Sequence, residues 1–138
     1  MTKSKPSIES GNDNFMVELV DSSLWVHQLR HRGDPEKRER VEQLLRCGLA
    51  AWFAPVRLEL WRGVSNDRER RALRDYEAIL PEYAITNEVW ELAIQNADRG
   101  RANGLSFPLA DLLIFACSKI HRLKLAHADK HFEQMMSL

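Results

Sequence analysis

Short apolar segments alternate with helical segments along most of the chain, and this alternation constrains the fold more than any other feature of the sequence. The apolar segments are typical of buried strands, and the segments between them carry apolar residues at helical spacing. Parallel strands need long crossover connections, which are usually helices. The alternation therefore predicts an α/β fold, a three-layer α/β/α domain with a four- or five-stranded parallel sheet. We predict strands at 16–21, 49–54, 83–85 and 123–126, joined by helices at 22–33, 35–47, 56–64, 67–80, 87–102 and 108–121 and followed by a helix at 131–136.

Two regions of the chain differ sharply in composition. Residues 1–15 are polar and offer little to bury, so we predict a flexible N-terminal tail followed by one folded domain at 16–138. Apolar residues make up 44% of the chain and charged residues 29%, which is typical of a folded domain. No apolar run reaches the ~20 residues that cross a bilayer. Residues 1–15 also lack the apolar core of a secretory signal, so we expect a cytoplasmic protein without a membrane partner.

The charges of the chain balance, with 20 Lys and Arg side chains against 20 Asp and Glu side chains. Zero net charge disfavours a protein that binds nucleic acid through bulk positive charge, although it is compatible with a local basic region. Six arginines between residues 57 and 74 have two explanations, a solvated helical face paired with nearby acids or a surface that contacts RNA phosphates. The six are Arg57, Arg62, Arg68, Arg70, Arg71 and Arg74.

Four acidic residues stand where the predicted fold would bring them together. Asp21 ends the first strand and Asp129 lies just past the last one. If these strands are neighbours where the strand order reverses, both carboxylates face one crevice at the carboxyl edge of the sheet. Asp111 and Glu59 lie in otherwise apolar helical segments, where an uncompensated carboxylate costs several kcal/mol to bury. A helix N-terminus supplies part of the compensation, and a divalent cation would supply more.

Each acid also has an ordinary structural explanation. An acid after a strand commonly caps the next helix, and an acid in a first helical turn commonly interacts with the helix dipole. An isolated Glu59 is commonly solvated or paired with a cation. We expect Ser22 to cap the helix that follows Asp21. A shared site becomes the stronger explanation only because all four acids fall at convergent positions.

Four short motifs in order resemble those of PIN domains, and the resemblance covers nearly everything from residue 16 to residue 136. They are VDSSLWV at 20–26, PVRLEL at 55–60, ADLLI at 110–114 and DKHF at 129–132. Their order and spacing are similar to those of VapC-type toxins of type II toxin–antitoxin systems. The resemblance implies a metal-dependent endoribonuclease with carboxylates around Mg²⁺ or Mn²⁺, which are hard cations that take oxygen ligands. These carboxylates would be Asp21, Glu59, Asp111 and Asp129.

The same resemblance implies a division of roles and a set of partners. Asp21 and Asp129 would bind the tighter ion directly, Asp111 and Glu59 would complete the site, and Ser22 would orient a ligand or the attacking water. Because water is the nucleophile, the products would carry a 5′-phosphate and a 3′-hydroxyl. Several carboxylates in one place should raise the pKa of at least one of them. The family also implies an RNA substrate (transfer, ribosomal or messenger RNA), a cognate antitoxin that fills an apolar groove, and a homodimer.

The sequence departs from the family pattern in places. His127 stands where the family often has Thr or Asn, Phe115 replaces a smaller residue, and little chain follows the last motif, which predicts a short or absent fifth strand. His127 and His131 could clip a zinc ion, for which a third ligand is not evident, or lie at the rim of the carboxylate site and contact RNA phosphate. Trp25 and Trp61, if partly exposed, would line a groove for a partner helix.

Three other functions fit the sequence less well. A catalytically inactive PIN-like module would bind RNA or protein without cutting. Another metal-dependent phosphohydrolase on a similar sheet often has an Asp-x-Asp pair after the first strand, whereas Ser22 and Ser23 follow Asp21 here. A phosphoacceptor signalling domain should have a lysine after a late strand, and Lys124 precedes the core of the last one.

Overall fold

The sheet is parallel and its central strand is the first one in the chain. A computed structural model describes residues 16–138, and the flexible tail predicted for residues 1–15 lies outside them. The strands are β1 (Glu18–Val20), β2 (Ala50–Ala51) and β3 (Lys124–Ala126), arranged in the order β2-β1-β3 with both pairs parallel. The α/β class with a parallel sheet is therefore confirmed, and the first and last predicted strands are neighbours.

The sheet has fewer strands than the four or five that we predicted. Within residues 16–138, three strands form the ladder, and a single parallel bridge between Trp52 and Glu82 extends it beyond β2. The amide of Trp52 donates to the carbonyl of Pro81 at 3.1 Å, and the amide of Tyr83 donates to the carbonyl of Trp52 at 2.9 Å. The bridge lies at Glu82, and residues 83–85 form no strand, because the chain beside them turns into a helix at Ala54.

Seven helices in the described residues follow the predicted order with small shifts at their ends. Several begin at side chains that accept a hydrogen bond from a free backbone amide, as Asp34, Asn66 and Thr86 do. The helices are α1 (Ser22–Leu29), α2 (Pro35–Arg46), α3 (Ala54–Arg62), α4 (Asp67–Ile79), α5 (Asn87–Ala102), α6 (Leu109–Ile120) and α7 (His131–Met136).

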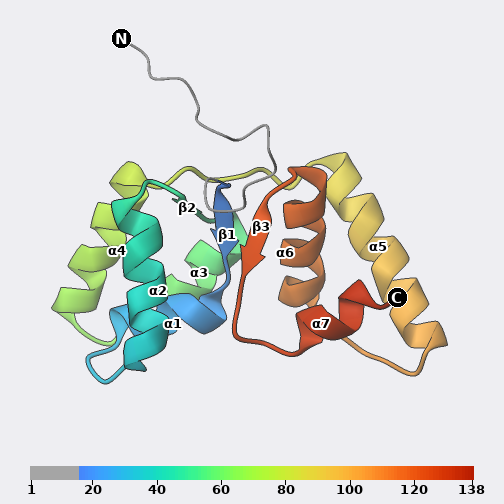
Figure 1. Cartoon of the computed structure of the whole chain (residues 1–138), viewed down its shortest axis with the longest axis horizontal. Coiled ribbons are helices and arrows are strands. Elements are labelled where there is room, and N and C mark those ends of the chain that lie inside the picture. The colour runs from blue at the N-terminus through green and yellow to red at the C-terminus, as the bar shows by residue number, and fades with distance from the viewer. Residues whose placement is uncertain (1–15) are drawn as a thin grey trace, which may run out of the picture.

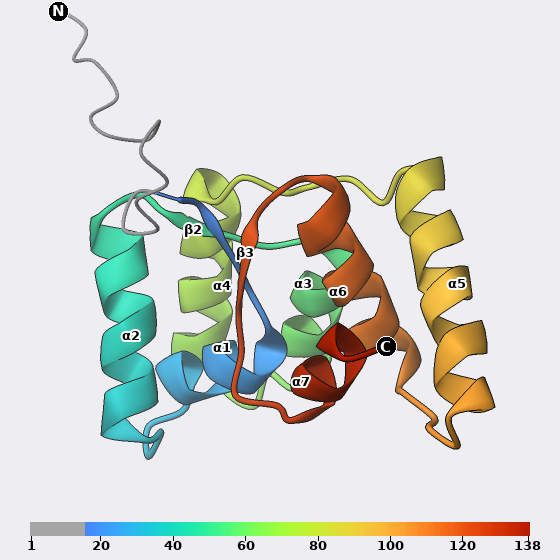
Figure 2. The same ribbon diagram turned by 45° about the vertical axis from the view of Figure 1, so that its right-hand side comes forward.

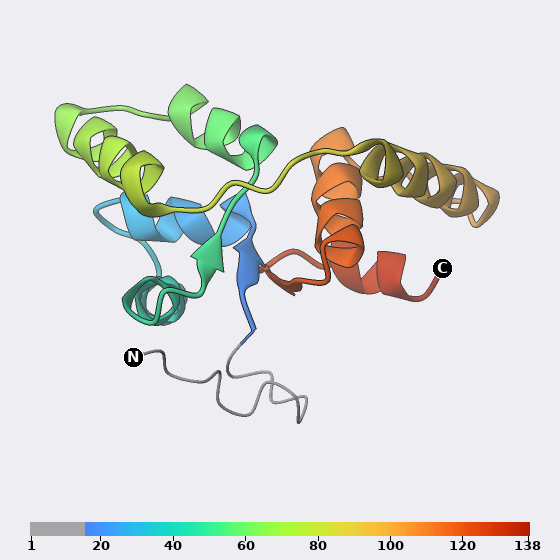
Figure 3. The ribbon, with the colours of Figure 1, turned by 90° about the horizontal axis from the view of Figure 1, so that it is seen from above.

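The connections place helices on both faces of the sheet. Helices α1 and α2 connect β1 to β2, whereas α3 to α6 lead from β2 past β1 to β3. Right-handed crossovers that run in opposite directions put their helices on opposite faces. Figure 3 agrees, with α2 on one face of the strands and α3, α4 and α6 on the other. The predicted three-layer arrangement is thus the observed one.

The carboxyl ends of the strands meet at one edge of the molecule. In Figure 1, β1 and β3 run downward and end where α1 and α7 begin, and α6 starts at the same level. Figure 2 keeps these starts close to one another after a 45° turn. Since the strand order reverses between β1 and β3, this edge is the expected place for a ligand site. Within residues 16–138, none of the helices has the length and apolar character to cross a membrane.

Trp25 lies in the core and not in a groove. Its side chain is fully buried and packs against Trp52, with ring centroids 5.9 Å apart, and against Tyr76, at 5.1 Å. Trp61, by contrast, is partly exposed. We expected Trp25 and Trp61 to line a groove if both were partly exposed. Of these two tryptophans, only Trp61 can do so.

Candidate metal centre

Asp21 is positioned by the junction between β1 and α1. Its backbone amide donates to the carbonyl of Ala126 at 2.9 Å, so the sheet fixes its main chain. Its carboxylate Oδ2 accepts from the amide of Ser23 at 3.0 Å and caps α1. The cap expected at Ser22 is therefore wrong, because Asp21 already occupies the capping position and Ser22 is the first helical residue. Asp21 is 4% exposed.

Asp129 is held by the loop between β3 and α7. The hydroxyl of Ser23 accepts from the amide of Ala128 at 3.0 Å, which ties this loop to α1. We did not predict this role of Ser23 from the sequence. The only hint was that Ser23 lies two residues after Asp21. Nδ1 of His127 accepts from the amide of Asp129 at 3.2 Å, and its ring packs on Phe132 at 4.7 Å. His127, the residue that departs from the family pattern, thus shapes the backbone that presents Asp129.

Asp111 lies in the first turn of α6 and meets the start of α7. Its Oδ2 lies 2.8 Å from Nδ1 of His131, and the same ring nitrogen lies 3.2 Å from Oδ1 of Asp129. The three residues offer donor atoms within 4.8 Å of one another. Histidine at the rim of the carboxylate site was one of our expectations for His131, and its direct contact with both carboxylates goes beyond that expectation.

The charges of this group act most strongly on Asp111. The pKa of Asp111 is raised from 3.8 to about 6, chiefly by burial. The hydrogen bond with His131 opposes this shift, and the nearby carboxylates of Asp129 and Asp21 add to it. The expectation that at least one acid has a raised pKa is therefore in accord with the structure. Asp21 acts on Asp111 through its charge, although it is not among the residues whose donor atoms lie within 4.8 Å of one another. We call Asp21, Asp111 and Asp129 the acidic cluster.

Glu59 lies apart from the acidic cluster. It projects from α3 and lines a small separate cavity with Leu29, Arg30, Gly63 and Glu69. It is neither among the residues whose donor atoms lie within 4.8 Å of one another nor among the charges that act on Asp111. Its part in a metal site therefore stays a prediction, as does the part predicted for Ser22.

The residues at the carboxyl edge fit a hard divalent cation. Carboxylate oxygens from Asp21, Asp111 and Asp129 are ligands of the kind that Mg²⁺ and Mn²⁺ prefer. Asp111 is only 9% exposed, and its side chain is hydrogen-bonded to His131, so its negative charge has little compensation from solvent. A cation would supply that compensation, and it would also relieve the repulsion among the three carboxylates.

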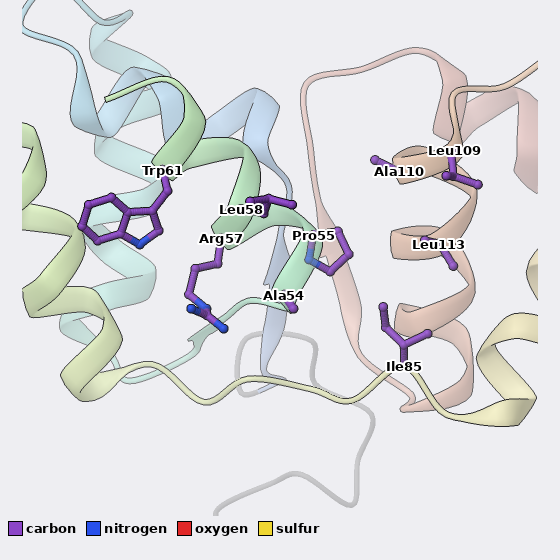
Figure 4. A pocket seen from close by; sticks show the side chains of 9 residues that line it. All are labelled: Ala54, Pro55, Arg57, Leu58, Trp61, Ile85, Leu109, Ala110 and Leu113. Carbon is purple, nitrogen blue, oxygen red and sulfur yellow. The ribbon is translucent and has the colours of Figure 1, made fainter. Parts of the chain in front are cut away.

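An apolar groove runs beside the acidic cluster, between α3 and α6 (Figure 4). Its volume is about 590 Å³, and Leu58 and Leu109, on opposite walls, are 69% and 71% exposed. Ala110, which directly precedes Asp111, lines the same wall as Leu109. The lining residues are Ala54, Pro55, Arg57, Leu58, Trp61, Ile85, Leu109, Ala110 and Leu113.

The arginine-rich stretch at 57–74 is partly engaged in ion pairs. Arg57 contacts Glu82 at 2.7 Å and Glu77 at 3.3 Å, and Arg70 contacts Asp67 at 2.8 Å. The first of our two explanations, a helical face paired with nearby acids, therefore describes these two arginines.

The raised pKa of Asp111 predicts how stability changes with pH when no metal is present. Because the fold favours the protonated form, the contribution of Asp111 to the free energy of unfolding is fully present below its ordinary pKa of 3.8. That contribution is lost as the pH rises through about 6. Urea unfolding in EDTA at several pH values measures this loss, and Asp111→Asn should flatten it. Equal pH profiles for the wild type and Asp111→Asn would contradict the prediction.

Solved structures with this fold include complexes from two bacteria. A chain of VapBC2 from Rickettsia felis, bound to a DNA fragment from their promoter, aligns with a TM-score of 0.70 and 18% identity, covering 86% of this chain and 92% of that chain. A chain of FitAcB from Neisseria gonorrhoeae aligns with a TM-score of 0.64 and 16% identity, covering 88% and 94%. At these low sequence identities, the two matches show a shared fold and nothing further. Comparison with curated proteins gives no match.

The family is shown by the sequence itself. The PIN domain family model matches residues 19–137, which run from β1 to the end of α7. The matched stretch contains all four motifs and the acids Asp21, Glu59, Asp111 and Asp129. The chain therefore belongs to the PIN domain family.

Proposed function

We propose that this chain is a metal-dependent endoribonuclease, a VapC-type toxin that cleaves RNA phosphodiesters with water and is inhibited by a cognate antitoxin. The observation that carries the proposal is the convergence of Asp111, Asp129 and His131 at the carboxyl edge of the sheet, with Asp21 close enough to act on Asp111. Carboxylates gathered against their own repulsion favour a bound cation. PIN domain membership supports a nuclease, and the likeness to chains of VapBC2 and FitAcB supports the toxin type.

The chain's own residues would share the work of the reaction. Mg²⁺ or Mn²⁺, when bound, would neutralise the phosphodiester and lower the pKa of a bound water. Asp21, Asp111 and Asp129 would hold the ion, and the bond from the Ser23 amide would fix the Asp21 carboxylate. Ser22 would orient the attacking water. Because that water replaces the ribose 2′-hydroxyl as nucleophile, the products would carry 5′-phosphate and 3′-hydroxyl ends.

Glu59 would act at the margin of this centre. Its place on α3, apart from the acidic cluster, suits a contact made through ordered water and not a direct metal bond. We therefore propose that Glu59 completes the site indirectly.

The antitoxin would occupy the apolar groove between α3 and α6. An amphipathic helix could lay its apolar face against Leu58 and Leu109, which are largely exposed. Ala110 places the end of the groove next to Asp111, so a basic side chain on that helix would reach the acidic cluster. An apolar groove beside concentrated negative charge is complementary to a segment of that composition.

The remaining partners follow from the same proposal. The substrate would be RNA, with transfer RNA one candidate, and the chain would act in the cytoplasm as a homodimer. Arg71, on α4, is exposed and forms no ion pair within residues 16–138, so it would be available to contact RNA phosphates.

Cleavage of total RNA by the purified chain tests the proposal. With Mg²⁺ or Mn²⁺ we expect discrete products with 5′-phosphate ends, and we expect EDTA to abolish them. Asp21→Asn should reduce the rate of cleavage by more than about 100-fold. Mutation of residues that only orient metal ligands already lowers metal affinity or activity by about 10- to 100-fold. Asparagine caps helices as well as aspartate does, so this variant keeps the start of α1.

Asp34→Asn is the matched control, because Asp34 caps α2 through the amide of Lys37 at 3.1 Å and lies outside the acidic cluster. It should cut RNA like the wild type. Equal cleavage by the wild type and Asp21→Asn would point to a contaminating nuclease. No cleavage, together with no metal-dependent rise in melting temperature, would overturn the proposal in favour of an inactive PIN-like module that binds RNA or protein.

A further inference from the structure

We propose that His131 supplies a nitrogen ligand to the ion held by Asp111 and Asp129, and that this ligand makes the centre bind Mn²⁺ in preference to Mg²⁺. The inference rests on the proposed function and deepens it. The donor set that the PIN domain resemblance implied consisted of carboxylates, and His131 adds a nitrogen atom to it.

The spacing of the donor atoms suits a shared ion. Nδ1 of His131 lies 2.8 Å from Oδ2 of Asp111 and 3.2 Å from Oδ1 of Asp129. Two neighbouring ligands of an octahedral ion, each about 2.1 Å from it, lie about 3.0 Å apart. The imidazole nitrogen therefore already stands at the separation from both carboxylates that a common ion would require.

His131 is held in this position before any ion arrives. Its backbone amide donates to Oδ1 of Asp129 at 2.9 Å, which couples its place at the start of α7 to that carboxylate. Its ring lies edge-on to Phe107, with centroids 6.1 Å apart, and its side chain is 33% exposed. A ligand fixed in this way loses little conformational freedom on binding, which favours coordination.

His127, the other histidine beside Asp129, is less suited to the role. Its Nδ1 already accepts a hydrogen bond from the amide of Asp129, and its ring packs against Phe132. It is also absent from the group of residues whose donor atoms converge. The structure therefore singles out His131 as the candidate for a nitrogen ligand.

A nitrogen ligand changes which ion the centre prefers. Mg²⁺ takes oxygen ligands and gives up its water reluctantly, whereas imidazole suits the transition metals. The ion would displace to solvent the proton that Nδ1 of His131 shares with Oδ2 of Asp111. His131, with its remaining proton on Nε2, would then offer the Nδ1 lone pair to the ion. The two carboxylates would still provide the negative charge, so Mg²⁺ would bind, but more weakly than Mn²⁺.

Pulsed electron paramagnetic resonance of the full chain loaded with Mn²⁺ tests the ligand directly. A coordinated imidazole gives a coupling from nitrogen-14, and growth with histidine labelled by nitrogen-15 should change that coupling without any mutation. The coupling should disappear in His131→Gln and persist in His31→Gln, a control at an exposed histidine in the loop after α1. Titration with Mn²⁺ under Mg²⁺ competition should show that His131→Gln lowers the Mn²⁺/Mg²⁺ affinity ratio by about tenfold or more.

The outcomes separate this inference from the proposed function. Mn²⁺ binding without a histidine coupling would show that His131 is not a ligand, while the carboxylate centre would remain supported. A coupling that persists in His131→Gln but disappears in His127→Gln would likewise exclude His131 as the ligand. An unchanged affinity ratio in His131→Gln would overturn the preference for Mn²⁺. Failure of the wild type to bind either ion would overturn the proposed function itself.

Discussion

Asp111→Asn is expected to lose RNA cleavage by more than about 100-fold and, in the absence of metal, to become more stable than the wild type. The loss follows because the amide removes a charged donor from the acidic cluster. The gain follows because burial raises the pKa of Asp111 to about 6, so the charged form destabilises the fold at neutral pH. A pKa shift from 3.8 to about 6 corresponds to a change of at most roughly 3 kcal/mol in the free energy of unfolding.

Solvent screening and the weakened bond to His131 reduce that gain, so we expect about 1–2 kcal/mol in the free energy of unfolding. Chemical unfolding in EDTA at pH 7 measures it. Adding Mn²⁺ should then stabilise the wild type far more than the variant. Asp98→Asn, at an exposed position on α5, is the control and should change neither activity nor stability. Destabilisation of Asp111→Asn without metal would show that Asp111 serves the fold and not a cation.

Trp25→Ala is expected to cost about 3–5 kcal/mol in the free energy of unfolding. Trp25 is fully buried and joins α1 to Trp52, beyond β2, and to Tyr76 of α4 through ring contacts. A cavity at this junction removes packing from three parts of the fold at once. Since a domain of this size is commonly stable by only 5–15 kcal/mol, the variant should unfold at a much lower urea concentration.

Trp90→Ala is the matched control, because Trp90 is 45% exposed on α5 and should cost about 1 kcal/mol or less. Trp25→Phe should fall between the two, since it keeps an aromatic ring and removes an indole N–H without a partner among the described residues. Similar losses for Trp25→Ala and Trp90→Ala would contradict the placement of Trp25 in the core.

The local sequence pattern predicted much of the fold, because the order of strands and helices along the chain determines the class of fold. The alternation of strands and helices predicted a parallel sheet, and the pairing of β1 with β3 in the structure meets the condition under which Asp21 and Asp129 share one edge of it. Pattern failed where neighbours in space decide the outcome. Residues 83–85, expected to form a strand, follow a single bridge at Glu82 and form no strand. The residue that caps α1 is Asp21, one position before the Ser22 that we expected.

The sequence by itself therefore determined the fold class and which acids could gather, because parallel strands joined by helices place their carboxyl ends at one edge whatever their side chains do. Only the tertiary structure decided which donor atoms meet. Asp111 and His131 are 20 residues apart on different helices, and their 2.8 Å contact depends on how α6 packs against α7. The separate place of Glu59 was decided in the same way, because the direction of a side chain on a helix follows from the packing of that helix and not from its motif.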